Sequence, residues 1–216
     1  MVDQPRDDKG RWKKSGVGVA AVATVGVVAI AGGGGLGGAA STADSATSSG
    51  SHGKSSGKSS GKDAARKGQR DAAWQRMGLK VVKKALKREL LCSTRSFGEV
   101  QRFFVRTPCR KLDRMVLAIG DGGGNTVVVS IAWVRMATAD DAARLKRLTD
   151  TDGTGNVSPL GAAALGLAEI RFDGHHYDSR QDGSLVVIAE AAPAGGQPDN
   201  AALDDAADVA DEFPPP

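Results

Sequence analysis

The common motifs of catalysis and nucleotide binding are missing from this sequence. It contains no nucleophile elbow, no HExxH zinc motif, no phosphate loop and no dinucleotide-binding fingerprint. With only two cysteines, Cys92 and Cys109, it also lacks the four closely spaced ligands of a structural zinc site. We therefore assign no catalytic, cofactor-binding or metal-binding residues from motifs, and we expect no bound cofactor.

Large apolar and aromatic side chains are also scarce. Aromatic residues make up 4% of the 216 residues, whereas there are 29 glycines. The chain before about residue 60 and after about residue 196 holds few large apolar side chains. This leaves about 100 to 120 residues for a hydrophobic core, which is the commonest size of a single domain.

Acidic residues are few in one part of the chain and basic residues are absent from another. Basic residues far outnumber acidic ones between Lys54 and Glu89, whereas every charged residue from Asp199 onward is acidic. The net charge of +4 conceals this separation. We expect the basic segment and the acidic tail either to attract each other or to bind separate partners.

Charged residues are absent from residue 15 to residue 43, directly after Lys13 and Lys14. About twenty helical residues cross the hydrocarbon layer of a membrane, so we predict a transmembrane helix over residues 16–38. Lysines on its N-terminal side place residues 1–15 in the cytoplasm and the rest of a single-pass plasma-membrane protein outside. A signal peptide cleaved near residues 39–41, giving a secreted protein, is the second interpretation, and a cytosolic linker is the third.

Residues 39–70 have the composition of a flexible linker. They are rich in Gly, Ser and Lys and carry the repeat Gly-Lys-Ser-Ser at Gly53 and Gly57, followed by Gly61 and Lys62. Such a low-complexity segment cannot bury enough apolar surface to offset its chain entropy. We therefore predict that it is disordered.

The remaining sequence predicts an alternation of helices and hairpins. Residues 71–91 have the apolar spacing of a basic amphipathic helix, in which Trp74, Met77, Val81 and Ala85 share a face. Ser96 and Glu99 fit a capping box for a helix between the cysteines, and Thr107–Pro108 fits the start of a short helix carrying Leu112.

Runs of β-branched residues predict the strands. Residues 115–119 and 127–134 form one hairpin around a Gly-rich turn, and a helix capped by Thr138 follows. A second hairpin is formed by residues 169–172, or a little beyond, and residues 184–190, with residues 175–183 between the strands or extending them. The fold class is therefore α+β, with a mainly antiparallel sheet of two hairpins and helices packed on one face. It would be an extracytoplasmic domain of residues 71–192, followed by an acidic tail, residues 193–216, that ends in prolines.

The two cysteines bear on the compartment of the domain. Outside the cytoplasm a pair of this kind is typical of a disulfide, which would stabilise the domain by about 3 kcal/mol. In a cytosolic protein Cys92 and Cys109 would be free thiols. The predicted anchor and the predicted disulfide support each other.

Two polar segments are candidates for a site. Residues 150–156, DTDGTGN, resemble part of a calcium loop but lack its closing glutamate, so we interpret them as a turn after a helix. Residues 173–180 concentrate His175, His176, Asp178 and Arg180, a speculative functional cluster for acid–base or metal chemistry. In an extended strand His175 and His176 point to opposite faces, whereas His176 and Asp178 share one. An ordinary polar hairpin rim is the alternative interpretation.

Several segments together carry a family resemblance: SFGEVQRFF after a cysteine, TPCRKLDR, VVVSIAWVRM, GTGNVSPLG, RFDGHHYDSR, VVIAEA and the closing PPP. With this set, the chain from about Leu79 to Pro216 resembles uncharacterised single-pass membrane or exported proteins of actinobacteria. The resemblance implies an exported location. It brings no activity and no catalytic residues.

These features predict a membrane-anchored binding or scaffolding module of the cell envelope, without catalysis. Its partners would be the membrane, anionic lipid or wall polymer bound by the basic helix and linker, or a protein. The first alternative is a small envelope hydrolase that uses the cluster from His175 to Arg180. The second is a cytosolic polyanion-binding protein, although nucleic acid is not an expected partner because no recognition module is present.

Overall fold

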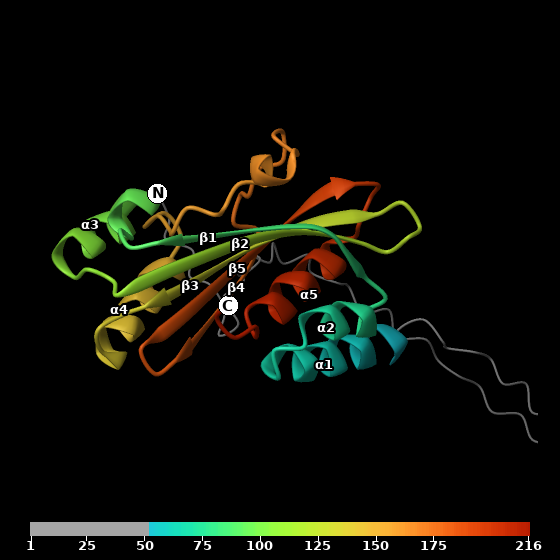
Figure 1. Ribbon diagram of the computed structural model, residues 1–216, viewed down its shortest axis with the longest axis horizontal. Helices are drawn as coiled ribbons and strands as arrows, with labels where there is room; N and C mark the ends of the chain where they lie inside the picture. Colours follow the sequence, from blue (N-terminus) through green and yellow to red (C-terminus); the bar gives the residue numbers. More distant parts are fainter. Residues whose placement is uncertain (1–51) are drawn as a thin grey trace, which may run out of the picture.

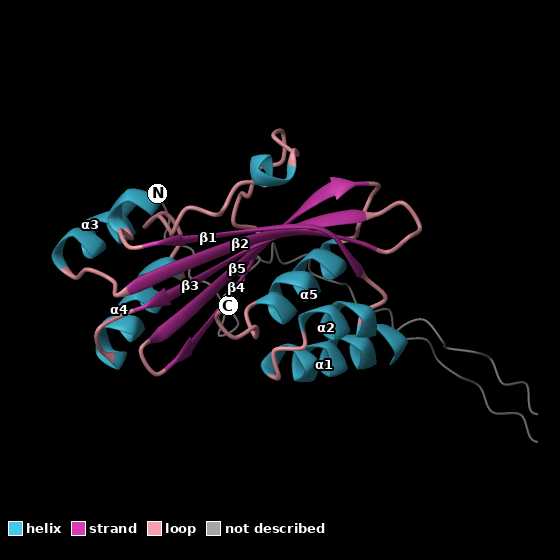
Figure 2. Cartoon of the chain, viewed as in Figure 1, coloured by secondary structure: helices cyan, strands magenta, loops and turns pink. Residues whose placement is uncertain are grey.

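An antiparallel sheet with helices on both faces forms the part of the chain that the computed structural model describes, residues 52–216, with side chains from residue 57 onward (Figures 1 and 2). Five strands lie in the order β1-β2-β3-β5-β4: β1 Lys80–Glu89, β2 Lys111–Gly120, β3 Thr126–Arg135, β4 His176–Asp182 and β5 Leu185–Gly195. The helices are α1 His52–Arg66, α2 Arg70–Arg76, α3 Gly98–Arg106, α4 Ala139–Thr149 and α5 Asn200–Ala210, with short 3-10 helices η1 Ser93–Arg95 and η2 Ala162–Leu165. The α+β class and the antiparallel sheet are confirmed.

The predicted transmembrane segment, residues 16–38, lies outside the described residues. Within residues 52–216 no helix has the length and apolar character that crossing a membrane requires.

The first predicted hairpin is confirmed, and its strands are longer than predicted. β2 and β3 pair from Lys111 opposite Arg135 to Gly120 opposite Thr126. In the turn, the Asp121 carboxylate accepts hydrogen bonds from the backbone N–H groups of Gly123 and Asn125. The central strands are buried on both faces, which explains why their apolar residues do not alternate with polar ones.

The second hairpin is confirmed, but its first strand lies in the segment predicted to separate or extend the strands, and not over residues 169–172. β4 covers His176–Asp182 and pairs with β5, whereas residues 169–172 lie in a loop. Ile170 and Phe172 are apolar because this loop packs on the sheet beside Val116 and Val128. Burial of a loop on the sheet therefore produced a sequence pattern typical of a strand.

Residues 71–91 do not form the predicted amphipathic helix. α2 ends at Arg76, and Gly78 then adopts a φ of 76°, a conformation that glycine reaches without strain. From Lys80 to Glu89 the chain is instead edge strand β1, paired with β2 from Gly120 to Leu112. Lysines along an edge strand discourage pairing with other chains, which explains its composition.

The predicted disorder is wrong for residues 52–66, which form α1. Ala64 and Ala65 of α1 are completely buried in the main core, together with Trp74 of α2. The C-terminal residues are also part of the fold rather than a tail, because Leu203, Val209 and Phe213 lie in the same core. The core therefore extends beyond the predicted limits of residues 71–192 at both ends.

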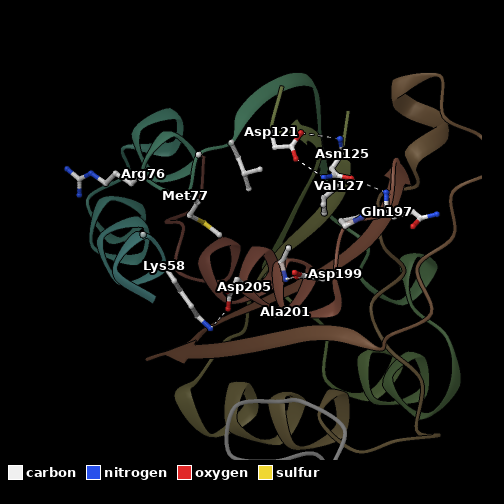
Figure 3. A pocket seen from close by; sticks show the side chains of 15 residues that line it. Lys58, Arg76, Met77, Asp121, Asn125, Val127, Gln197, Asp199, Ala201 and Asp205 are labelled. Atoms are coloured by element: carbon white, nitrogen blue, oxygen red, sulfur yellow. Dashed lines mark hydrogen bonds and ion pairs between the residues drawn. The ribbon is translucent and has the colours of Figure 1, made fainter. Parts of the chain in front are cut away.

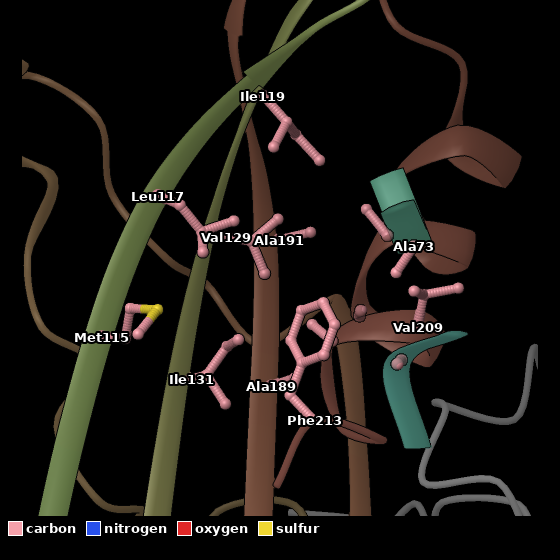
Figure 4. Packing of buried hydrophobic residues seen from close by; sticks show 14 of the residues in the cluster. Ala73, Met115, Leu117, Ile119, Val129, Ile131, Ala189, Ala191, Val209 and Phe213 are labelled. Atoms are coloured by element: carbon pink, nitrogen blue, oxygen red, sulfur yellow. The ribbon is translucent and has the colours of Figure 1, made fainter. Parts of the chain in front are cut away.

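Helices cover both faces of the sheet, which corrects the prediction of one covered face. Alternate residues of β2, β3 and β5, such as Ile119, Val129 and Ala189, point toward α1, α2 and α5 (Figure 4). The intervening residues, such as Val134 and Ile188, pack against α3 and α4 or against the loop that carries η2. Each central strand thus contributes to two cores.

The disulfide between Cys92 and Cys109 is confirmed, with Cα atoms 6.0 Å apart. The helix between the cysteines, α3, is also confirmed, but its capping box is wrong. Ser96 Oγ donates to the carbonyl oxygen of Cys92, and the carbonyl oxygen of Thr154 accepts from the N–H group of Glu99 instead. The short helix predicted at Thr107–Pro108 is absent from the described structure, because the chain there enters β2.

Candidate functional site

Strand β4 brings together three of the four residues in the predicted cluster. His176, Asp178 and Arg180 alternate along β4 and face α5, as the period of a strand requires. His176 Nδ1 lies 2.9 Å from Asp204 Oδ1 of α5. His175 precedes the strand, is exposed, and lies 4.0 Å from Asp173, so it does not join the other three.

Asp178 and Asp208 form a buried pair of carboxyl groups that share a proton. Burial, the hydrogen bond to Asp208 and the nearby charge of Asp211 raise the pKa of Asp178 to about 9. Burial by itself would raise the pKa of Asp208 as well, but hydrogen bonds to Asp178 and Lys58 hold that pKa well below its ordinary value. At neutral pH Asp178 is therefore the protonated partner and Asp208 the ionised one.

A third buried carboxyl group lies next to this pair. Burial and the charge of Glu212 raise the pKa of Asp211 to about 7. Its Oδ1 atom has no hydrogen-bond partner among the described residues, although the residue is only 5% exposed. Such an atom can accept a hydrogen bond from a further donor.

We refer to Asp178, Asp205, Asp208, Asp211 and Glu212 as the acidic groove. All but Asp205 line a hollow of about 400 Å³ between α1, β4 and α5. Basic residues of α1 lie against it. Lys58 contacts Asp205 at 2.7 Å and also pairs with Asp208, while Lys62 lies 3.7 Å from Asp208 and 3.4 Å from Glu212.

Arg66 completes the contact between α1 and the acidic groove. Its Nη2 atom lies 2.5 Å from Glu212 Oε1. On the opposite side Arg180 Nε lies 3.5 Å from Glu212 Oε2 and donates to the backbone carbonyl of Asp211 at 3.2 Å. The attraction expected between the basic segment and the acidic tail is thus present.

The described part of the cluster has the geometry of an ionic network rather than of a nucleophile beside a base. Ser179 Oγ points to the other face of the sheet and donates to Asp150 Oδ1 at 2.6 Å. Tyr177 donates to the same atom at 3.0 Å, so the Asp150 carboxylate stabilises the packing of α4 on β4. Within residues 57–216, no group of three or more His, Cys, Asp or Glu side chains has the geometry to hold a metal ion.

A larger hollow lies beside Gly57 and Lys58 of α1 (Figure 3). Its volume is about 520 Å³, and its lining combines apolar side chains of Met77, Leu79 and Val127 with a polar rim that includes Asp121 and Asp205. Asp205 and Lys58 connect this hollow to the acidic groove. Nothing in the sequence indicated it, since its lining comes from four separate segments.

A different surface surrounds the disulfide. Leu90 is 79% exposed, Leu91 65% and Val105 70%, and all three line one shallow hollow of about 250 Å³ beside Cys92 and Cys109. The exposed basic residues next to them are Lys87, Arg88, Arg102, Arg106 and Arg110. We call these eight residues the basic apolar edge.

The disulfide gives this surface its shape. It joins the chain after β1 to the chain after α3, so Leu90 and Leu91 are held next to Val105. Of the acidic residues close in sequence, Glu89 is paired with Arg95 and Arg114, Asp113 lies 3.7 Å from Arg88 and 2.7 Å from Lys111, and Glu99 is exposed. Solvent-exposed apolar side chains that are grouped and rimmed by charge are typical of an interaction site.

Comparison with known proteins identifies no relative, because no protein-family model, no curated protein and no solved structure matches this chain. The resemblance to exported actinobacterial proteins therefore stays a prediction.

The cysteine pair and the polar cluster on β4 are recognisable in the sequence, but the basic apolar edge is not. The sequence pattern places Leu90 and Leu91 in a helix, where they extend its apolar face. The available signal was Gly78 in the middle of that helical pattern, because glycine lowers helix stability by about 1 kcal/mol relative to alanine. A helix that ends at Gly78 leaves residues 80–89 free to form a strand, and Leu90 and Leu91 then follow that strand.

Proposed function

We propose that this protein is a non-catalytic binding module of the cell envelope that lies on an anionic membrane surface through its basic apolar edge. The exposed Leu90, Leu91 and Val105, rimmed by basic side chains, are the observation that carries the proposal. The membrane anchor predicted at residues 16–38 would keep the domain close to that surface. The basic surface that binds the partner is thus formed by the end of β1 and by α3, and not by the predicted basic helix.

The apolar residues favour lipid over a wall polymer as the partner. A polar polymer could satisfy the arginines but would leave the leucines in water. Transfer of one leucine side chain into an apolar phase stabilises by about 1.5 to 3 kcal/mol when burial is complete. Each Lys or Arg close to an anionic bilayer adds about 1 kcal/mol. Two or three apolar side chains and several cations together suffice for reversible binding.

The disulfide supports the compartment that this proposal requires. Disulfides persist in oxidising environments, so the bond between Cys92 and Cys109 indicates an extracytoplasmic domain. The alternative of a cytosolic polyanion-binding protein requires two free thiols, and neither cysteine is free.

Footprinting of the full chain in proteoliposomes would test the proposal. The protein is reconstituted in vesicles of phosphatidylcholine alone or with added phosphatidylglycerol, and side-chain oxidation by hydroxyl radicals is measured by mass spectrometry. We expect oxidation of Leu90, Leu91 and Val105 to fall several-fold only in the anionic vesicles. Val82, which is 62% exposed near the other end of β1, is the internal control and should not change.

Two results would contradict the proposal. Equal oxidation of Leu90 and Leu91 in both kinds of vesicle would show that the edge does not contact anionic lipid. Protection of Val82 to the same degree would show a general shielding of the domain rather than binding through this edge.

A further inference from the structure

α1 is built from a repeated unit that contacts two other helices at once. Gly57 and Gly61 are each followed by a lysine, Lys58 and Lys62, and the same Gly-Lys pair occurs once more at Gly53. Residues four apart lie on one face of a helix, so each kind of residue forms a row along α1.

The glycine row allows α1 to lie close to α2. A Cβ atom at Gly57 would be 2.9 Å from the carbonyl oxygen of Arg76, and one at Gly61 would be 3.1 Å from that of Ala73. A Cβ atom at Gly57 would require a shift, and one at Gly61 would require the neighbouring carbonyl to move by a few tenths of an ångström. A chain segment bound here therefore fits best with glycine at both positions.

The lysine row lies along the acidic groove. Lys58 and Lys62 share Asp208, and they reach Asp205 on one side and Glu212 on the other. The Oδ1 atom of Asp211, buried and without a hydrogen-bond partner among the described residues, lines the same hollow. A lysine that moves along the groove thus passes from one carboxylate acceptor to the next.

A shift of α1 by four residues reproduces these contacts. Gly53 and Gly57 would take the places of Gly57 and Gly61, and the lysines that follow them would take the places of Lys58 and Lys62. At the C-terminal end of α1, Ser60 would replace Ala64, Gly61 would replace Ala65, and Lys62 would replace Arg66. Every buried position of the segment would receive a small residue, and every position paired with an acid would receive a cation.

We propose that the groove between α2 and the acidic residues of α5 and β4 is a binding site for a repeating glycine–lysine unit, and that it holds the chain's own repeat in two registers four residues apart. The observed register is the major one because it buries the methyl groups of Ala64 and Ala65. In the second register the α1–α2 connection grows from residues 67–69 to residues 63–69.

The exchange would change the reach of the chain that precedes α1. Four helical residues span about 6 Å. A shift by four residues therefore moves each residue of α1, and the chain that precedes it, by about 6 Å relative to the sheet. Exchange between the two registers does not require membrane binding by the basic apolar edge.

Distance measurements between two spin labels would test it. Ser59 and Asp182, both exposed, are replaced by cysteine in the full chain, labelled, and measured by electron–electron resonance, with the native disulfide checked by mass spectrometry. The substitutions A64S and A65G remove the advantage of the observed register. We expect them to raise the population of a second distance at least several-fold, with a change of up to about 6 Å.

The matched control adds S60E to this variant. In the observed register Ser60 is only partly buried and its carbonyl oxygen accepts from Arg76 Nη1, so a glutamate there has a cation beside it. In the second register it would carry a carboxylate into the buried site of Ala64, and the second distance should disappear.

Three results would overturn the proposal: one unchanged distance in A64S/A65G, a broad distribution without a second maximum, or a second distance that persists with S60E. If circular dichroism shows that the double variant is unfolded, A65G alone is measured by the same criteria.

Discussion

The two lysine-rich segments of this protein look alike in sequence and differ completely in their surroundings. In α1, Lys58, Lys62 and Arg66 all face acidic residues of the groove. In β1, Lys84 and Lys87 are exposed and form no ion pair within the described part of the chain. One set of charges stabilises the fold, and the other is exposed to solvent.

The difference depends on residues far away in the sequence. Glu212, which pairs with Arg66, lies 146 positions further along the chain. Composition alone cannot distinguish a lysine that meets such an acid from one that meets solvent. The contrast between α1 and β1 therefore leads to substitutions that should act on stability in one region and on binding in the other.

Removal of the disulfide should have the largest effect, because the bond links the chain after β1 covalently to the chain after α3. In C92S/C109S we expect the free energy of unfolding to fall by about 3 kcal/mol, the usual contribution of a bond that closes a loop of this length. Urea denaturation at pH 7 would measure it, with the reduced parent protein as a second reference. An unchanged midpoint would show that the packing of Phe104 and Leu112 suffices to hold α3.

In the acidic groove, Asp178→Asn should stabilise the protein at high pH. The pKa of Asp178 is raised to about 9 by burial and by the hydrogen bond to Asp208, whereas its pKa in the unfolded chain is about 3.9. Between these values the unfolded state releases a proton that the folded state keeps, so the stability of the parent protein falls as pH rises. Asparagine does not titrate. The advantage of the variant should grow from pH 4 to pH 9 and reach at least about 1 kcal/mol at pH 8.

Asp208→Asn is the opposite case and serves as the comparison. Asp208 is the ionised partner and accepts from Lys58, so its replacement leaves a partly buried lysine without that charge. We expect a loss of about 2 kcal/mol at pH 7, because a hydrogen bond to a charged group contributes about 1.5 to 3 kcal/mol. Denaturation curves at several pH values would distinguish the effect of Asp178→Asn from that of Asp208→Asn. Equal effects of both substitutions at every pH would mean that the proton is not held by Asp178.

The central hairpin and α4 were predictable because their signals are local. The side chain of Thr138 caps α4 by accepting from the N–H group of Asp141, as its position before two acids indicates. Strands β2 and β3 are marked by runs of β-branched residues on both sides of a glycine-rich turn. The cysteine pair follows from its position around one helix.

α1 and β1 were not predictable, because tertiary contacts override their local preferences. Glycine and serine disfavour a helix, yet α1 forms because its glycines fit against α2 and its lysines reach α5. The segment from Lys80 to Glu89 carries a helical apolar spacing, yet the exposed edge of β2 pairs with it along its whole length. In the candidate site, His176 and Asp178 were correctly expected on one face of a strand, but their acidic partners lie in a segment interpreted as a tail.

On the basic apolar edge, Arg102→Gln together with Arg106→Gln should weaken binding without changing stability. Both arginines are exposed on α3 beside Val105. The loss of two cations near an anionic bilayer corresponds to about 2 kcal/mol, or about thirtyfold in affinity, at low ionic strength. Footprinting of Leu90 and Leu91 over a series of phosphatidylglycerol contents would measure it.

The matched control for this pair is Arg144→Gln with Arg147→Gln on α4. It changes the net charge by the same amount at exposed positions of another helix. Its effect on the footprint should be small, and an equal loss would indicate that net charge rather than the edge determines binding.

The smallest effect concerns the glycine row of α1. Alanine is a better helix former than glycine by about 1 kcal/mol, so Gly57→Ala should stabilise α1 if propensity decides. We expect the reverse, a loss of about 1 kcal/mol, because the new Cβ would lie 2.9 Å from the Arg76 carbonyl oxygen and would push α1 away from α2. Gly161→Ala is the control, since its φ of −62° is ordinary and no atom lies within 4 Å of its Cβ position. Thermal denaturation should therefore show opposite signs for the two changes, and a stabilising Gly57→Ala would mean that α1 does not need the close contact.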